Sequence, residues 1–200
     1  KKVEAALNSN ESPVDPQRMC RETRDWLATL GDSIVIGDGG DIVATAAKIL
    51  PVPREGAWMD PGPLGTLGVG MPFALAAQIA HPSKRVVIIY GDGSFGLNGF
   101  EYDTAVRFGL PIIGVLGNDA AWGQMMRPQG AVYGWDRLAA TELTYTRYDK
   151  VVEALGGHGE YCERPEEIRP ALDRAAASGK PALVNIKIRQ DKEYKGGIYV

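Results

Sequence analysis

Residues 85–96 read RVVIIYGDGSFG, and this stretch decides the fold. The uninterrupted apolar run at 85–90 predicts a strand that is buried on both faces, as in a parallel sheet. Glycines at 91, 93 and 96 then indicate a tight turn that leads into a helix near 100–108. The stretch therefore predicts an α/β unit whose turn lies at the carboxyl end of a buried strand.

The same alternation of buried strand and helix recurs along the chain. We predict further strands at 33–36, 112–116, 160–162 and 182–188, and helices at 16–30, 42–49, 71–80, 145–155 and 164–177. This order predicts an α/β fold with three layers, a mostly parallel sheet with helices on both faces. Because right-handed crossovers bring the carboxyl ends of such strands to one edge, we expect ligands to bind there.

Composition excludes several classes of protein. Lys and Arg number 22 against 25 Asp and Glu, which gives a net charge of −3 over 200 residues and no basic surface for nucleic acid. No uncharged apolar run reaches the roughly 18 residues of a membrane helix, and the first residues lack the apolar core of an export signal. Two cysteines exclude a disulfide framework or a four-cysteine zinc site. We therefore expect a cytoplasmic globular protein without nucleic acid or membrane partners.

The segment GDGSFG at 91–96 matches the glycine pattern of a dinucleotide site, but Asp92 argues against that reading. A carboxylate between the first two glycines would repel a pyrophosphate unless a divalent cation lay between them. Asp119 follows Asp92 by 27 positions, at the end of the next predicted strand. Two carboxylates at one sheet edge favour a magnesium–diphosphate site. An ordinary polar turn and a plain NAD site remain as alternatives.

Glycines at 62, 65, 68 and 70 form a second unusual segment. They would weaken any helix that contained them, and their spacing suits backbone lying against a flat ligand. Leu64 and Leu67 would supply the apolar contacts. The alternative is a loop that simply allows close packing.

Taken together, these motifs resemble those of thiamine diphosphate (ThDP) enzymes. Asp92-Gly93 with Asn118-Asp119 resembles the GDG…NN motif, and residues 65–68, GTLG, resemble the GTM/GTL loop. The resemblance covers residues 16–200 and the C-terminal, diphosphate-binding domain of acetolactate-synthase-like enzymes. The segments WMDPGPLGTLGVG, GNDAAWGQ and KGGIYV look most like 2-hydroxyacyl-CoA lyases.

The resemblance implies a Mg²⁺ site built from the Asp92 and Asp119 side chains and the Ala121 carbonyl. Asp119 stands where the family has asparagine; if the alignment register shifts by one residue, Asn118 becomes the ligand instead. The implied contacts to ThDP further include two groups of residues. The residues implied to contact the diphosphate are Gly93, Ser94, Gly40 and Asp41, and Asp41 would do so through its backbone N–H. The residues implied to contact the rest of the cofactor are Gly65, Thr66, Leu67, Trp122 and Gly123. Within this set, the Gly65 carbonyl would meet the aminopyrimidine and Leu67 would bend the cofactor.

The implied activity is cleavage of a 2-hydroxyacyl-CoA to formyl-CoA and an aldehyde or ketone. An acetolactate-synthase-like carboligase, an oxalyl-CoA decarboxylase and a non-catalytic subunit remain as alternatives. The family's proton-relay glutamate lies on a pyrimidine-binding domain, and no residue here matches it, so we assign no catalytic residue. We expect that domain on another chain or in a missing N-terminal region, with acyl-CoA as substrate and a homo- or hetero-oligomer. We predict a linker at 1–15, the ThDP diphosphate-binding domain at 16–190 and a tail at 191–200.

Overall fold

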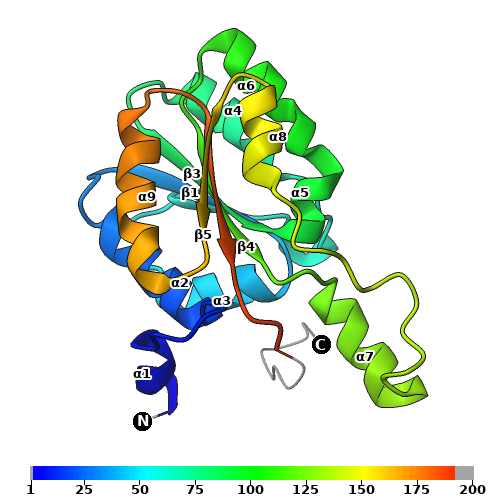
Figure 1. The fold of residues 1–200 in the computed structure, drawn as a ribbon. Coiled ribbons are helices and arrows are strands. Elements are labelled where there is room, and N and C mark those ends of the chain that lie inside the picture. The colour runs from blue at the N-terminus through cyan, green and yellow to red at the C-terminus, as the bar shows by residue number, and fades with distance from the viewer. Residues whose placement is uncertain (1, 192–200) are drawn as a thin grey trace.

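A computed structural model describes residues 2–191, and its centre is a six-stranded sheet in which every pairing is parallel (Figure 1). The strand order is β2-β1-β3-β4-β6-β5. The strands are β1 (Ser33–Asp38), β2 (Trp58–Met59), β3 (Arg85–Gly91), β4 (Ile113–Asn118), β5 (His158–Cys162) and β6 (Ala182–Lys187). Every residue of β1 and β4 is buried, as expected for strands covered on both faces.

Helices cover both faces of this sheet, which confirms the predicted three-layer α/β fold (Figure 1). The α-helices are α1 (Lys2–Leu7), α2 (Pro16–Leu27), α3 (Asp41–Ile49), α4 (Gly70–Ala80), α5 (Asp92–Asn98), α6 (Tyr102–Phe108), α7 (Gly123–Tyr133), α8 (Tyr148–Ala154) and α9 (Pro165–Ala177). Two short 3₁₀ helices are η1 (Gly62–Leu64) and η2 (Gly99–Glu101). Helices α2, α3 and α9 pack on one face, and α4, α5, α6 and α8 on the other.

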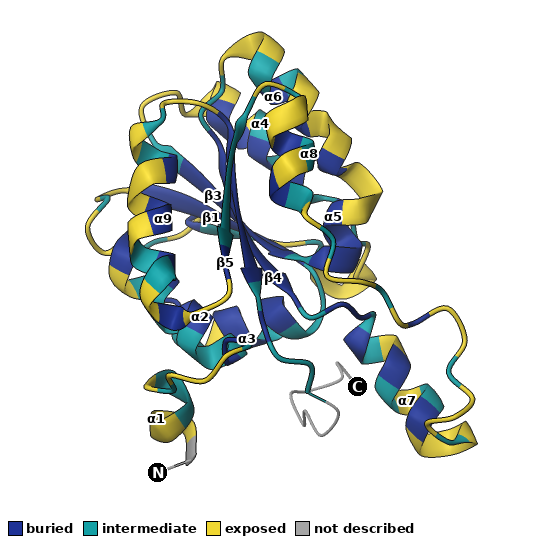
Figure 2. Cartoon of the chain, in the orientation of Figure 1, coloured by how far each residue is buried: buried dark blue, intermediate teal, exposed yellow. Residues whose placement is uncertain are grey.

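Each face of the sheet has its own hydrophobic core, and the helices turn their exposed sides to solvent (Figure 2). Trp26 of α2 is fully buried in the core beneath α2, α3 and α9. On the other face, the Phe95 ring packs edge-on against Tyr90 with their centroids 5.5 Å apart. Because Phe95 belongs to α5, this packing fixes the helix that follows β3 directly over the sheet.

The structure differs from the sequence prediction in several elements. The turn at 91–96 is already helical, since α5 begins at Asp92. Helix α7 and strand β2 were not predicted. The segment 1–15, expected to be a linker, contains α1, and its Val14 forms a parallel bridge with Ile188. Except for Asp191, the predicted tail lies outside the described residues, as does the KGGIYV motif.

None of the helices within residues 2–191 has both the length and the apolar character of a membrane-spanning segment.

Candidate cofactor site

The candidate site lies where the crossovers after β1 and β3 diverge. The chain after β1 leads to β2 on one side, and the chain after β3 leads to β4 on the other. Such a switch point leaves a crevice outside the carboxyl ends of the strands. The two turns touch at its floor, because a Cβ on Gly39 would lie 2.9 Å from the Gly91 nitrogen. Only glycine fits there without moving the backbone.

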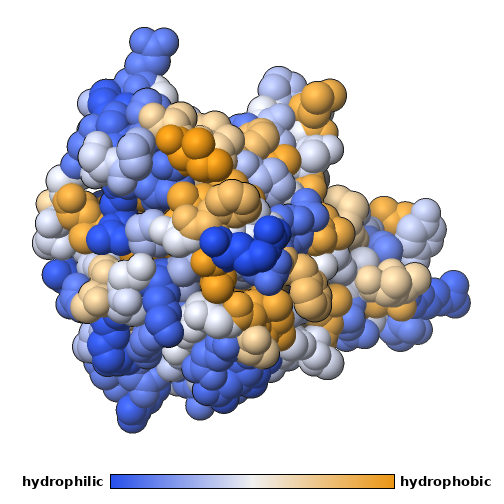
Figure 3. Space-filling view, turned by 90° about the horizontal axis from the view of Figure 1, so that it is seen from above, coloured by the Kyte–Doolittle hydropathy of each residue, from blue (hydrophilic) through white to orange (hydrophobic). Residues whose placement is uncertain are grey.

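A cavity opens at this crevice, and most of the predicted cofactor residues line it. Its lining includes the predicted residues Gly40, Asp41, Leu67, Asp92, Gly93, Ser94, Asp119, Ala121, Trp122 and Gly123. Gly65, Thr66 and Asn118 are absent from that lining. No described residue from the opposite end of the sheet lines the cavity. The surface of the molecule at that end, seen from above in Figure 3, has apolar patches beside strongly hydrophilic ones.

Asp92 is a buried carboxylate with one unsatisfied oxygen. Its Oδ1 accepts a hydrogen bond of 2.8 Å from the Gly93 amide, whereas Oδ2 is buried without a partner among the described groups. Burial raises the pKa of Asp92 to about 6, although backbone N–H groups oppose the shift. A bound cation would supply the missing partner, since a buried carboxylate otherwise lacks compensation for its lost hydration.

Asp119 faces the same cavity from the end of β4. Burial, and then the neighbouring carboxylates of Asp92 and Asp41, raise the pKa of Asp119 to about 8. Mutual repulsion of this kind is relieved by a divalent cation between the carboxylates. Within residues 2–191 no cluster of three or more His, Cys, Asp or Glu side chains could hold a metal alone. The remaining ligands would have to be backbone carbonyl, water or phosphate oxygens.

The turn after β4 separates the roles of Asn118 and Asp119. The fully buried Asn118 side chain donates to the Thr146 carbonyl at 3.0 Å and accepts from the Ala120 amide at 3.3 Å. Ala120 adopts a left-handed conformation with φ of 57°, which is uncommon for alanine and marks a constrained turn. These contacts commit Asn118 to the fold and leave Asp119 on the cavity. The geometry thus favours Asp119 over Asn118 as a ligand.

Ala121, next along this turn, forms an antiparallel bridge with Glu142. The bridge uses the Trp122 amide, 2.9 Å from the Thr141 carbonyl, and the Ala120 carbonyl. The carbonyl of Ala121 takes no part in those two hydrogen bonds. It therefore remains a candidate metal ligand, as predicted.

Helix α3 begins at the cavity with Gly40 as its N-cap and Asp41 as its first residue. Backbone N–H groups at a helix N-terminus bind phosphate, so α3 is suited to a diphosphate. The Asp41 carboxylate is held by Arg127 of α7 through two hydrogen bonds of 2.6 Å each. Sequence analysis missed Arg127, and nothing local marked it, because its partner lies 86 positions away.

The glycine-rich segment is held by another residue that sequence analysis assigned no role. The fully buried Asp38, at the end of β1, accepts hydrogen bonds from the amides of Gly68 at 2.9 Å and Gly70 at 2.7 Å. Asn98 donates to the Gly68 carbonyl from the other side. These contacts fix the segment beside the cavity, which Leu67 lines. Gly65 and Thr66 precede Leu67 and are exposed residues.

Gly93 offers a direct test of how tightly the site is packed. A Cβ at Gly93 would lie 2.6 Å from a Trp122 ring carbon, so Gly93→Ala is expected to displace that ring from the cavity. We expect a changed Trp122 fluorescence spectrum and ThDP affinity lower by about tenfold or more. Gly96→Ala on the same helix is the control, because its Cβ would meet nothing within 4 Å. An equal loss of affinity in both variants would contradict this account.

The arrangement therefore fits a metal ion bound with a diphosphate. It has a buried Asp92 with an unsatisfied oxygen, a half-buried Asp119 at the end of the neighbouring strand, and a helix N-terminus beside them. This donor set prefers a hard cation such as Mg²⁺.

Comparison with known proteins identifies the class. The family described as thiamine pyrophosphate enzyme, C-terminal TPP binding domain, matches residues 38–186, and the chain belongs to this family. The fold is also that of the ThDP-dependent 4-hydroxybenzoylformate decarboxylase from Rhodococcus jostii RHA1, with a TM-score of 0.82. The match covers 92% of this chain and 34% of that chain, at 21% sequence identity.

Among individual relatives, the chain is similar to proteins with two different names. It is 43% identical over 182 residues to the acetolactate synthase large subunit of Mycobacterium tuberculosis, covering 91% of this chain and 33% of that protein. It is 43% identical over 175 residues to 2-hydroxyacyl-CoA lyase 2 of Caenorhabditis elegans, covering 84% and 27%. The human 2-hydroxyacyl-CoA lyase 2 is 39% identical over 94% of this chain and 30% of that protein. The chain thus spans about a third of the length of these relatives.

Proposed function

We propose that this chain forms the Mg²⁺- and diphosphate-binding half of the active site of a ThDP-dependent carbon–carbon lyase. The observation that carries the proposal is a pair of carboxylates on one cavity at the ends of β3 and β4, Asp92 buried and Asp119 half-buried. The family membership supports ThDP as the cofactor. When bound, ThDP supplies the carbanion-stabilising chemistry with which bonds next to a carbonyl carbon are broken or formed.

In this proposal the chain's own residues bind and orient the cofactor. Asp92, Asp119 and the Ala121 carbonyl hold the cation, and the α3 N-terminus with Gly93 and Ser94 receives the diphosphate. Leu67, which lines the cavity, would pack against the cofactor between its two rings. Gly65 and its neighbour Thr66, which lie outside the lining, would contact its aminopyrimidine part.

Charge makes the cation essential to this binding mode. Arg189 is the cationic residue among the described lining residues, and its guanidinium donates to Asp15 at 2.8 Å. Asp92 and Asp119 would repel a diphosphate in the absence of a metal. We therefore expect removal of Mg²⁺ to abolish ThDP binding rather than to weaken it slightly.

The proposed reaction is cleavage of a 2-hydroxyacyl-CoA to formyl-CoA and an aldehyde or ketone, or its reverse. Similarity to 2-hydroxyacyl-CoA lyase 2 proteins supports this substrate class. The 43% identity to an acetolactate synthase subunit over 91% of the chain favours a carboligase as the second candidate. Either activity needs a pyrimidine-binding domain, which the chain would meet on a partner or elsewhere in a longer polypeptide.

The test combines the chain with a pyrimidine-binding domain and assays 2-hydroxyacyl-CoA cleavage with ThDP and Mg²⁺. We expect formyl-CoA from the combination, none from the chain alone and none after chelation of Mg²⁺. Metal-dependent ThDP binding with acetolactate formed from pyruvate would support the carboligase instead. Turnover by the chain alone would contradict the proposal that it holds half of the site.

A further inference from the structure

The Asp41–Arg127 ion pair joins two walls of the site that are far apart in sequence. Both guanidinium nitrogens Nη1 and Nη2 donate to the carboxylate, at 2.6 Å each. The two side chains are only 21% and 15% exposed, so solvent screens the pair poorly. Such planar, two-point contacts are the strongest ion pairs in proteins and also fix geometry.

The position of Asp41 is unfavourable for an anion site unless its charge is compensated. Asp41 lines the cavity and is the first residue of α3, whose first-turn N–H groups lie at the cavity. A free carboxylate there would repel the diphosphate that those N–H groups attract.

We propose that Arg127 is a positioning residue that cancels the charge of Asp41, so that the N-terminus of α3 can accept the diphosphate of ThDP. This inference rests on the proposed function. It goes beyond it by giving a cofactor-binding role to a residue of α7 that does not line the cavity.

The same contact also orients α7 relative to the metal turn. Gly123, the first residue of α7, approaches so closely that a Cβ there would overlap Asp41 Oδ2 and lie 3.1 Å from Arg127 Nη1. In Figure 1, α7 projects away from the layers that cover the sheet. Two roles are therefore separable: compensation of charge, and simple anchoring of α7. They predict different outcomes when both partners are replaced.

The test measures binding of Mg²⁺·pyrophosphate and Mg²⁺·ThDP by calorimetry on the full chain for Arg127→Met, Asp41→Asn and the double variant. Arg127→Met leaves the Asp41 charge uncompensated, so we expect affinity for both ligands to fall by about tenfold to a hundredfold. Asp41→Asn leaves an additional positive charge, so affinity should be unchanged or higher. The double variant removes both charges and should return to within about threefold of the original affinity.

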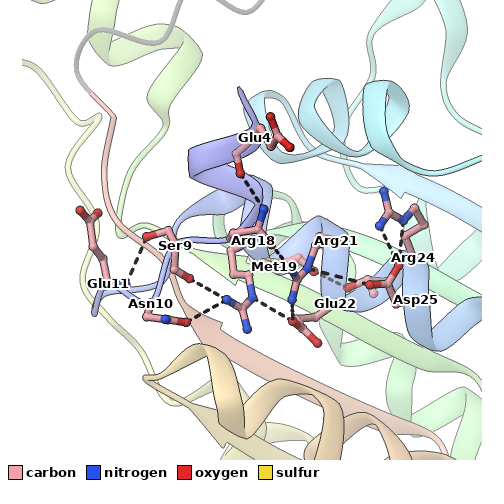
Figure 4. A network of polar contacts seen from close by, with 12 residues as sticks. Glu4, Ser9, Asn10, Glu11, Arg18, Met19, Arg21, Glu22, Arg24 and Asp25 are labelled. Atoms are coloured by element: carbon pink, nitrogen blue, oxygen red, sulfur yellow. Dashed lines mark hydrogen bonds and ion pairs between the residues drawn. The ribbon is translucent and has the colours of Figure 1, made fainter. Parts of the chain in front are cut away.

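If the pair only anchors α7, both single variants lose affinity alike and the double variant stays weak, which would overturn the inference. If Arg127→Met does not fold, Arg127→Lys replaces it, and retention of near-original affinity is expected because the charge remains. Arg18→Met is the matched control: it breaks the Arg18–Glu22 pair on α2, with both side chains 13% exposed, in the network of Figure 4. Absence of binding by the unaltered chain would instead contradict the proposed function.

Discussion

Asp92→Asn is expected to abolish Mg²⁺-dependent binding of ThDP while making the metal-free chain more stable. Loss of a charged ligand from a two-carboxylate site should lower affinity by about a hundredfold or more. In the absence of metal, the same carboxylate is buried with Oδ2 unpartnered, and burial raises its pKa to about 6. Its ionised form therefore opposes folding at neutral pH, and the neutral amide should stabilise the chain by about 1–2 kcal/mol.

Calorimetric titration with ThDP and Mg²⁺, and thermal unfolding in EDTA, measure the two effects separately. Asp103→Asn on α6 is a suitable control, because Asp103 is 53% exposed and paired with Arg107 on the surface. It should change neither measurement beyond about 0.5 kcal/mol. An Asp92→Asn protein that is less stable in EDTA and still binds ThDP would show that Asp92 is a structural residue.

Much of the fold could be predicted because most of its strands are short, continuous apolar runs. Runs such as VVIIY are apolar on both faces, which indicates buried parallel strands, and glycines at 37, 91 and 117 directly follow three of the runs and mark their turns. Helix α7 could not be predicted, since Gly123, Pro128 and Gly130 all disfavour a helix. Strand β2 has two residues and exists through its pairing with β1, in which Val35 faces Trp58. Tertiary contacts decide such elements, and a local pattern does not contain them.

The candidate site divides in the same way. Asp92 and Asp119 could be found because each follows a strand, and parallel strands bring their carboxyl ends together. The actual partners of Asp38 and Arg127 lie 30 to 86 positions away, so no local spacing points to them. These two residues shape the cavity by holding other backbone and side-chain groups. Their roles emerge only when the sheet and its crossovers are assembled.

Asp38→Asn is expected to lower the free energy of unfolding by about 2 kcal/mol and to weaken ThDP binding more than pyrophosphate binding. Asp38 accepts from the amides of Gly68 and Gly70, one with each carboxylate oxygen. Asparagine has one such oxygen, so its NH₂ group would face one of these buried N–H groups. Burial raises the pKa of Asp38, so loss of the charge alone is mildly favourable. An unsatisfied buried amide costs about 1–3 kcal/mol, and its repulsion by the NH₂ group adds to this, so the geometric loss should prevail.

The difference between the two ligands follows from what Asp38 holds. The segment fixed by Asp38 carries Leu67, which lines the cavity, whereas the proposed diphosphate contacts belong to α3 and α5. Pyrophosphate affinity should therefore stay within about threefold while ThDP affinity falls by about tenfold. Asp60→Asn is the control: Asp60 also accepts from a glycine amide, that of Gly62 at 2.8 Å, but it is exposed and water can replace the bond. Equal losses for both ligands would mean that Asp38 supports the whole sheet edge rather than this segment.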